Sequence, residues 1–134
     1  MAVGAHEPQA IAAVPGVRWG TAAAGFKHPD REDLALMALA EGSRTAVAFT
    51  RNRLRAAPVH VAEAHLADPG ARALLVNSGN ANASTGAPGL EVARASCRLA
   101  GEVLGVPDTA VLPFSTGVIG EPLPLAPFEA ALPV

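Results

Sequence analysis

Two segments rich in glycine carry the residues of this 134-residue chain that are best suited to chemistry. One reads NSGNANASTGAPG over Asn77–Gly89, the other reads STGVIG over Ser115–Gly120, and each follows a short apolar run. Glycine and asparagine tolerate backbone conformations that direct main-chain N–H groups outward, and Ser or Thr adds a hydroxyl. A turn of this kind between a strand and a helix can stabilise a developing negative charge. We therefore consider Gly79 and Gly117 as backbone donors of an oxyanion hole.

The same two segments also suit a purely structural role. Gly, Asn and Ser close tight turns and cap helices, and spacing alone does not separate this role from the functional one. Neither segment contains G-x-G-x-x-G or G-x-x-x-x-G-K-[ST], so no dinucleotide or nucleoside triphosphate can be assigned by motif. Both interpretations stay open at the level of spacing.

The other candidate side chains indicate structure rather than catalysis. Cys97 falls on the apolar face of a predicted helix, where a small thiol packs into a core. Asp30, Glu32 and Asp33 could supply an acid and a base, but they lie in a polar turn, and we interpret them as a solvated rim. The four histidines show no metal-ligand spacing, so no metal site is expected. They are His6, His28, His60 and His65.

Composition narrows the class of protein. Lys and Arg number 10 against 12 Asp and Glu, for a net charge of -2 with no basic run, which argues against nucleic acid and anionic membranes as partners. The longest apolar run, Leu34–Ala40, is too short to span a bilayer. No secretory signal opens the sequence, and a single cysteine suits a reducing compartment. We expect a globular protein of the cytoplasm.

Periodicity and turn residues predict the elements that position the two segments. The clearest helix runs from Leu90 to Leu104, where apolar residues recur at spacings of three and four until Gly105 and Pro107 end it. This order of elements predicts a mixed α/β fold, with residues 1–134 as one unit without an internal boundary. The remaining predictions are strands at Val17–Thr21, Ala73–Val76 and Thr109–Phe114, a hairpin pairing the stretch from Leu34 to Ala38 with Thr45–Thr50 across a turn at Glu41–Arg44, and helices at Val59–Leu66 and Pro127–Leu132.

Five strings of the sequence closely resemble the ornithine acetyltransferase family, whose members are also called glutamate N-acetyltransferases. The match runs in register along nearly the whole chain. It implies a layered mixed-sheet α/β sandwich of the type shared with amino-terminal-nucleophile aminopeptidases, incomplete in this chain. The strings are VPGVRWGTAAAGFK (Val14–Lys27), DLALM (Asp33–Met37), FTRNRLRAAPV (Phe49–Val59), VNSGNANASTG (Val76–Gly86) and STGVIGEPLP (Ser115–Pro124).

The resemblance implies a bifunctional enzyme of arginine biosynthesis that cleaves its own precursor into α and β chains, which assemble as an α2β2 heterotetramer. The new amino-terminal Thr of the β chain takes an acetyl group from N-acetylornithine and passes it to glutamate, in a ping-pong mechanism. In the family the Thr-Gly of the STGVIG string forms the oxyanion hole. The resemblance therefore assigns that role to the hydroxyl of Thr116 and the backbone N–H of Gly117.

For the NSGNANA string, the resemblance implies residues that line the pocket and hold the geometry of the loop around the nucleophile. These are Asn77, Gly79, Asn80 and Asn82. Ser84 stands where many family members have Cys, which puts no catalytic role in doubt. No bound cofactor or metal is implied, although acetyl-CoA is a candidate second substrate.

The resemblance places this chain in the amino-terminal part of the α chain. The nucleophilic Thr, most substrate contacts and any general base are missing, so activity requires the β chain. The sequence stops within a predicted helix, which we interpret as a truncation or break. Two alternatives stay open: a related aminopeptidase that transfers the acyl group to water, and an assembly fragment without catalytic activity.

Overall fold

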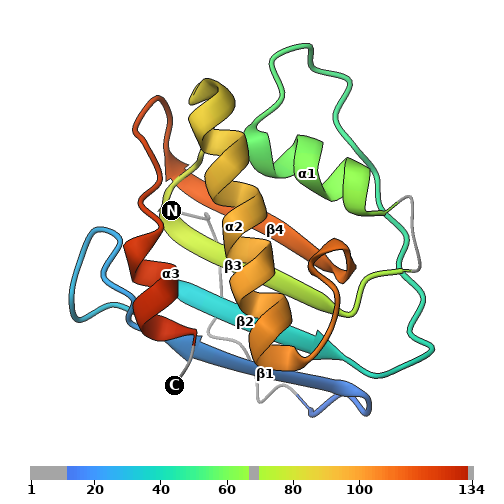
Figure 1. Cartoon of the computed structure of the whole chain (residues 1–134). Coiled ribbons are helices and arrows are strands. Elements are labelled where there is room, and N and C mark those ends of the chain that lie inside the picture. The colour runs from blue at the N-terminus through green and yellow to red at the C-terminus, as the bar shows by residue number, and fades with distance from the viewer. Residues whose placement is uncertain (1–11, 67–69, 133–134) are drawn as a thin grey trace, which may run out of the picture.

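A four-stranded mixed sheet forms the centre of the molecule in the computed structural model, which describes residues 12–66 and 70–132 (Figure 1). The strands lie side by side in chain order. The first two pairs are antiparallel and the last pair is parallel. The strands are β1 (Val17–Ala22), β2 (Leu34–Leu39), β3 (Ala73–Asn80) and β4 (Val111–Val118).

Helices cover one face of this sheet (Figure 1). The long helix α2 (Gly86–Leu104) connects the two parallel strands, followed by the short 3-10 helix η1 (Asp108–Ala110). Parallel neighbours need such a crossover because a tight turn cannot return the chain to the same end. Two shorter helices, α1 (Ala57–His65) and α3 (Ala126–Ala131), complete the layer. The predicted mixed α/β class is confirmed.

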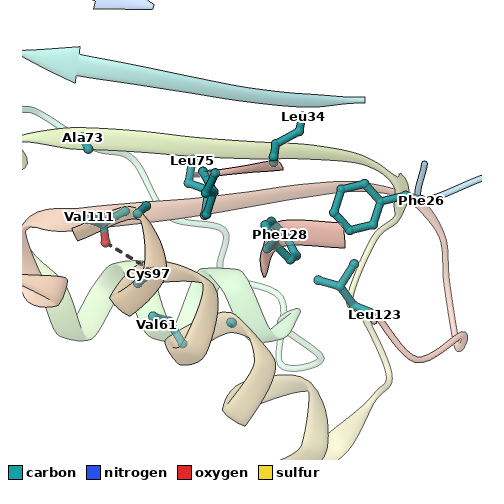
Figure 2. Close-up of a cluster of buried hydrophobic side chains, with 12 residues drawn as sticks. Phe26, Leu34, Val61, Ala73, Leu75, Cys97, Val111, Leu123 and Phe128 are labelled. Atoms are coloured by element: carbon teal, nitrogen blue, oxygen red, sulfur yellow. Dashed lines mark hydrogen bonds between the residues drawn. The ribbon is translucent and has the colours of Figure 1, made fainter. Parts of the chain in front are cut away.

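The core lies between the sheet and the helices (Figure 2). Leu75 of β3 and Val111 of β4 meet Val61 of α1 in one buried cluster. Phe26 and Phe128 stack edge to face, with ring centroids 4.8 Å apart at 68°, an arrangement that aromatic rings prefer. Small residues on the inner stripe of α2 let the helix approach the sheet closely. They are Ala93, Cys97 and Ala100.

The predicted hairpin between residues 34–38 and 45–50 is wrong. The first arm is β2, but the second forms no strand and lies in a loop that is exposed along most of its length. Both edges of β2 are already paired, by β1 and by β3. The β-branched residues of Thr45–Thr50 therefore had no edge to join, because strand propensity yields to tertiary pairing.

Both glycine-rich segments start as strand rather than as turn, which also corrects the prediction. β3 continues through Asn80 and β4 through Val118, and these two stretches pair in parallel register. The ladder supplies hydrogen bonds to a polar stretch that local propensity alone would leave as a turn. The loop after β3 is consequently short, and α2 begins at Gly86. The other predicted strands and helices are present, with shifted ends.

The sheet face away from the helices carries three exposed large apolar side chains. Trp19, Val76 and Phe114 have 70%, 37% and 43% of their surface exposed, and all three lie on that face by the strand register. Within the described part of the chain, no helix is both long enough and apolar enough to cross a membrane.

Candidate functional site

The site forms where the parallel strands β3 and β4 end together. Register pairs Asn77 with Ser115 and Gly79 with Gly117. The two glycine-rich segments, 38 residues apart in the sequence at this point, thus become neighbours along a ladder. Carboxyl ends of adjacent parallel strands are a common location for ligand sites.

Only glycine fits at the paired positions Gly79 and Gly117. Their φ angles are +127° and +131°, which other residues rarely adopt. A Cβ on Gly117 would lie 2.2 Å from the carbonyl carbon of Gly79. A Cβ on Gly79 would lie 2.9 Å from Cγ of Lys27. The missing side chains let two strands and the segment at Lys27 approach one another closely.

The backbone of Gly117 faces the outer edge of β4. The carbonyl of the next residue, Val118, accepts a hydrogen bond from the N–H of Ala81 at 2.9 Å and therefore faces β3. Backbone groups alternate in direction along a strand, so the N–H of Gly117 points away from β3, and β4 is the last strand of the described sheet. Thr116 and Gly117 are both exposed. A hydroxyl and a backbone N–H are therefore accessible at adjacent positions, as an oxyanion hole requires.

Asn77 links the two strands through its side chain. It is 2% exposed, and its Nδ2 donates to the carbonyl of Asn80 at 3.1 Å. Its Oδ1 accepts from the hydroxyl of Ser115 at 2.6 Å. A buried amide with both ends bonded fixes its surroundings, so Asn77 holds the strand ends in place.

Asn80 is held by two acceptors on the segment after β4. Its Nδ2 donates to Oε2 of Glu121 at 3.3 Å and to the carbonyl of Pro122 at 3.2 Å. Since both partners are acceptors, they determine which end of the amide faces them. The buried Oδ1 of Asn80 has no hydrogen-bond partner among the residues that the structure describes.

Asn82 secures the start of α2. Its φ is +48°, its Nδ2 donates to the carbonyl of Gly89 at 2.9 Å, and its Oδ1 accepts from Thr85 at 2.8 Å. Its own carbonyl accepts from the N–H of Ala57 at 3.1 Å. Asn82 is thus completely buried, and its hydrogen bonds join α1, α2 and the loop between β3 and α2.

A polar cavity of about 250 Å³ opens beside the paired glycines. Gly79 and Gly117 line it, whereas Asn77, Asn80 and Asn82 do not. The pocket-lining role of the three asparagines stays a prediction. The other lining residues are Lys27, His28, Arg31, Asp33 and Ser78.

Sequence reasoning missed the basic residues of this cavity. Lys27, His28 and Arg31 show no motif spacing, and the loop that carries them reaches the ends of β3 and β4 because the start of β2 pairs with the end of β3. Of these three residues, only Lys27 belongs to a string that resembles the ornithine acetyltransferase family, and the resemblance assigned it no role.

Asp33 is not part of a solvated rim, although Asp30 and Glu32 are exposed as predicted. It is 6% exposed, and its carboxylate accepts from the backbone N–H groups of Ala24 and Phe26, both at 2.8 Å, and of Gly25 at 3.3 Å. Backbone donors stabilise a buried carboxylate. Asp33 therefore fixes the loop that leads to Lys27.

Cys97 is a core residue, as predicted. Burial raises the pKa of its thiol from 9.0 to about 12, with a further increase from Asp108 and an opposing effect of Arg98. A neutral buried thiol is a poor nucleophile. His65 is also buried, with Nδ1 2.8 Å from the carbonyl of Val111. In residues 12–66 and 70–132, no three His, Cys, Asp or Glu side chains gather as metal ligands.

Comparison with known proteins identifies related sequences. The model of the ArgJ family matches residues 18–134. The arginine biosynthesis bifunctional protein ArgJ of Methylococcus capsulatus is 55% identical over 120 residues, and that of Pseudomonas syringae pv. tomato is 49% identical over 132. These alignments cover 90% and 98% of this chain but 29% and 32% of the relatives. The chain therefore spans about a third of their length.

Two solved structures share the fold. Arginine biosynthesis bifunctional protein argJ from Bacillus halodurans superimposes with a TM-score of 0.83 at 33% identity, covering 89% of this chain and 62% of that one. Ornithine acetyltransferase complexed with ornithine from Mycobacterium tuberculosis gives 0.83 at 34%, covering 89% and 65%. The sheet and helices described above are therefore an arrangement that both proteins contain.

Proposed function

This chain belongs to the ArgJ family, and from that premise we propose that it forms the amino-terminal part of the α chain of a glutamate N-acetyltransferase. The complete enzyme moves an acetyl group from N-acetylornithine to glutamate in arginine biosynthesis, in the cytoplasm. Its relatives carry the name of arginine biosynthesis bifunctional protein, which supports this assignment. Acetyl-CoA is the second acetyl donor to test.

The nucleophile in this proposal is the amino-terminal Thr of a β chain released by self-cleavage. Its hydroxyl oxygen bonds to the acetyl carbonyl carbon, and the carbonyl oxygen becomes negatively charged. As this intermediate collapses, the carbon–nitrogen bond of N-acetylornithine breaks, and the proton of the hydroxyl is transferred to the leaving amine of ornithine. The amine of glutamate then attacks the acetyl ester, the ester carbon–oxygen bond breaks, and a proton of that amine is transferred to the Thr oxygen. Both half-reactions pass through a tetrahedral oxyanion.

Thr116 and Gly117 stabilise that oxyanion in the proposal. The single observation that carries it is the position of Thr116 and Gly117, which are both exposed on the last strand of the described sheet, in register with Ser78 and Gly79. From the alternation of backbone groups along β4 we infer that the N–H of Gly117 points away from β3. Donors that are already oriented before the reaction need no rearrangement when charge develops. The tight Gly79–Gly117 pair supplies that fixed orientation.

Further polypeptide is expected to cover the open surfaces of this chain. An apolar cavity of about 320 Å³ lies between β1, β2 and the carboxyl ends of α2 and α3, and the opposite sheet face exposes Trp19 and Phe114. Exposed apolar surface of this kind favours a partner. We propose that the remainder of the α chain and the β chain complete a layered sandwich, assembled as α2β2.

The experiment that tests this function starts with the complete protein, expressed from its full coding sequence. Intact mass spectrometry and amino-terminal sequencing should reveal a second chain that begins with Thr. Incubation with N-acetylornithine should add one acetyl group to that chain, and glutamate should remove it as N-acetylglutamate. Release of acetate without transfer to glutamate would favour the aminopeptidase class instead. Absence of acyl-enzyme would indicate a silent assembly fragment.

A further inference from the structure

The side chain of Lys27 extends from the loop between β1 and β2 across the ends of β3 and β4. Lys27 follows Phe26 in this loop, and its Cγ occupies the space where Gly79 would carry a side chain, 2.9 Å from a Cβ built there. Its Nζ continues to Oε2 of Glu121, on the segment that follows β4. One side chain therefore spans from the loop after β1 across the end of β3 to the residues after β4.

Glu121 is the junction of this arrangement. The same Oε2 accepts from Nζ of Lys27 and from Nδ2 of Asn80, so one carboxylate oxygen connects the loop at Lys27 with the end of β3. The adjacent carbonyl of Pro122 accepts from the same Asn80 amide. The segment after β4 is thus bonded to both other segments within two residues.

The loop that carries Lys27 is itself rigid. Asp33 accepts three backbone N–H groups from residues 24–26, immediately before Lys27. Phe26 is 7% exposed and packs against Phe128. A side chain that starts from a fixed backbone loses less freedom when it makes its contacts. The side chain of Lys27, which is 35% exposed, therefore extends from a backbone that its neighbours hold in place.

We propose that Lys27, through its ion pair with Glu121, is a positioning residue that holds the Gly79–Gly117 crossing and so aims the N–H of Gly117. The inference rests on the proposed function, because Gly117 is a donor only if an oxyanion forms there. Lys27 acts through the backbone and does not contact the reacting atoms. Small displacements of an oriented donor lower the rate strongly, whereas they leave ground-state binding largely unchanged.

The test uses the complete protein with three variants. Lys27→Met keeps the apolar stem over Gly79 but removes the charge, Lys27→Arg keeps the charge, and Glu121→Gln removes the acceptor charge. The matched control is Arg55→Met, which breaks the Arg55–Glu63 ion pair of 2.6 Å. The side chains of that pair are 27% and 47% exposed, against 35% and 48% for Lys27 and Glu121.

The expected result is a fall in kcat of about tenfold for Lys27→Met and Glu121→Gln, with KM changed less than twofold. Lys27→Arg should recover most of the rate, and Arg55→Met should leave kcat unchanged. Hydrogen–deuterium exchange should increase for peptides that cover residues 79–82 and 116–121 in Lys27→Met and Glu121→Gln, but not in Lys27→Arg or Arg55→Met. The exchange measurement does not depend on activity.

Several outcomes would overturn the inference. These are an unchanged kcat in Lys27→Met, a rise in KM at constant kcat, which would make Lys27 a substrate contact, or equal losses in Arg55→Met, which would indicate general destabilisation. If the parent protein transfers no acetyl group, the proposed function fails. Unchanged exchange at the strand ends would then separately refute the positioning role.

Discussion

The two halves of the β3–β4 ladder use the same pairing for different purposes. In the first half, Ala73, Leu75 and Val111 are at most 2% exposed and pack against the helices. In the second half, Asn77 and Asn80 are equally buried but bonded to polar partners, and the paired glycines have no side chain at all. Apolar burial stabilises the first half, while hydrogen bonds and close backbone contact define the second. Apolar packing and close polar pairing are thus separated along one pair of strands.

Replacing Gly117 with alanine should have the largest effect on stability and activity, because the new side chain forces β3 and β4 apart in the second half of their ladder. The new Cβ would lie 2.2 Å from a backbone carbon that cannot move away. We expect the free energy of unfolding of the complete protein to fall by about 4 kcal/mol or more, with loss of acetyl transfer. Urea denaturation measures the first effect.

The control for that change is Gly120→Ala, two residues beyond the end of β4. Gly120 also has a positive φ, of +82°, but a Cβ there would meet nothing within 4 Å. Gly120→Ala should lower the free energy of unfolding only by the strain of a left-handed backbone conformation, about 1 to 2 kcal/mol. Equal losses in both variants would show that the close approach at Gly117 is unimportant.

Thr116→Ala should remove a donor without disturbing the ladder, because Thr116 is exposed at the strand end. Loss of one oxyanion donor typically lowers kcat about 10²- to 10³-fold. Steady-state kinetics of acetyl transfer measure this, and the melting temperature should stay close to that of the parent. Thr109→Ala, an exposed threonine before β4, should leave kcat unchanged. An unaltered rate in Thr116→Ala would refute the oxyanion assignment.

Leu75→Ala tests the apolar half alone. Leu75 is 2% exposed, and truncating a buried leucine costs about 2 to 5 kcal/mol. The same substitution at Leu54, which is 89% exposed, should change the free energy of unfolding by about 0.5 kcal/mol or less. Residual kcat of folded Leu75→Ala protein should match the parent. A loss of kcat would mean that the two halves are not separable.

The smallest effect concerns pH and Cys97. The thiol ionises near pH 9.0 when unfolded and near pH 12 when folded, so the unfolded state releases its proton first, and stability falls as pH rises above 9. At pH 10 this should amount to about 1.4 kcal/mol relative to pH 7. Cys97→Ala should lack that part of the pH dependence in urea titrations. Identical pH profiles for the two proteins would contradict the raised pKa.

Prediction from sequence succeeded where local pattern and tertiary environment agree. The stripe containing Ala93, Cys97 and Ala100 predicted α2 because helical periodicity directly encodes which face is buried. Prediction from sequence failed for Thr45–Thr50, which favour a strand but have no free edge of β2 to pair with. It also failed for Asp33, whose carboxylate accepts hydrogen bonds from the backbone of residues 24–26. In both cases the outcome depends on contacts with other segments of the chain, which the local pattern of residue types does not encode.

The amino-acid sequence by itself determined the α/β class, the long helix, the buried cysteine and the family, because these depend on composition, periodicity and contiguous strings. Only the tertiary structure decided that Gly79 and Gly117 face each other and that Lys27 reaches Glu121, 94 residues away. Parallel pairing brings together segments separated by a whole helix. No local pattern specifies such a register, because the residues that pair lie on opposite sides of α2 in the sequence.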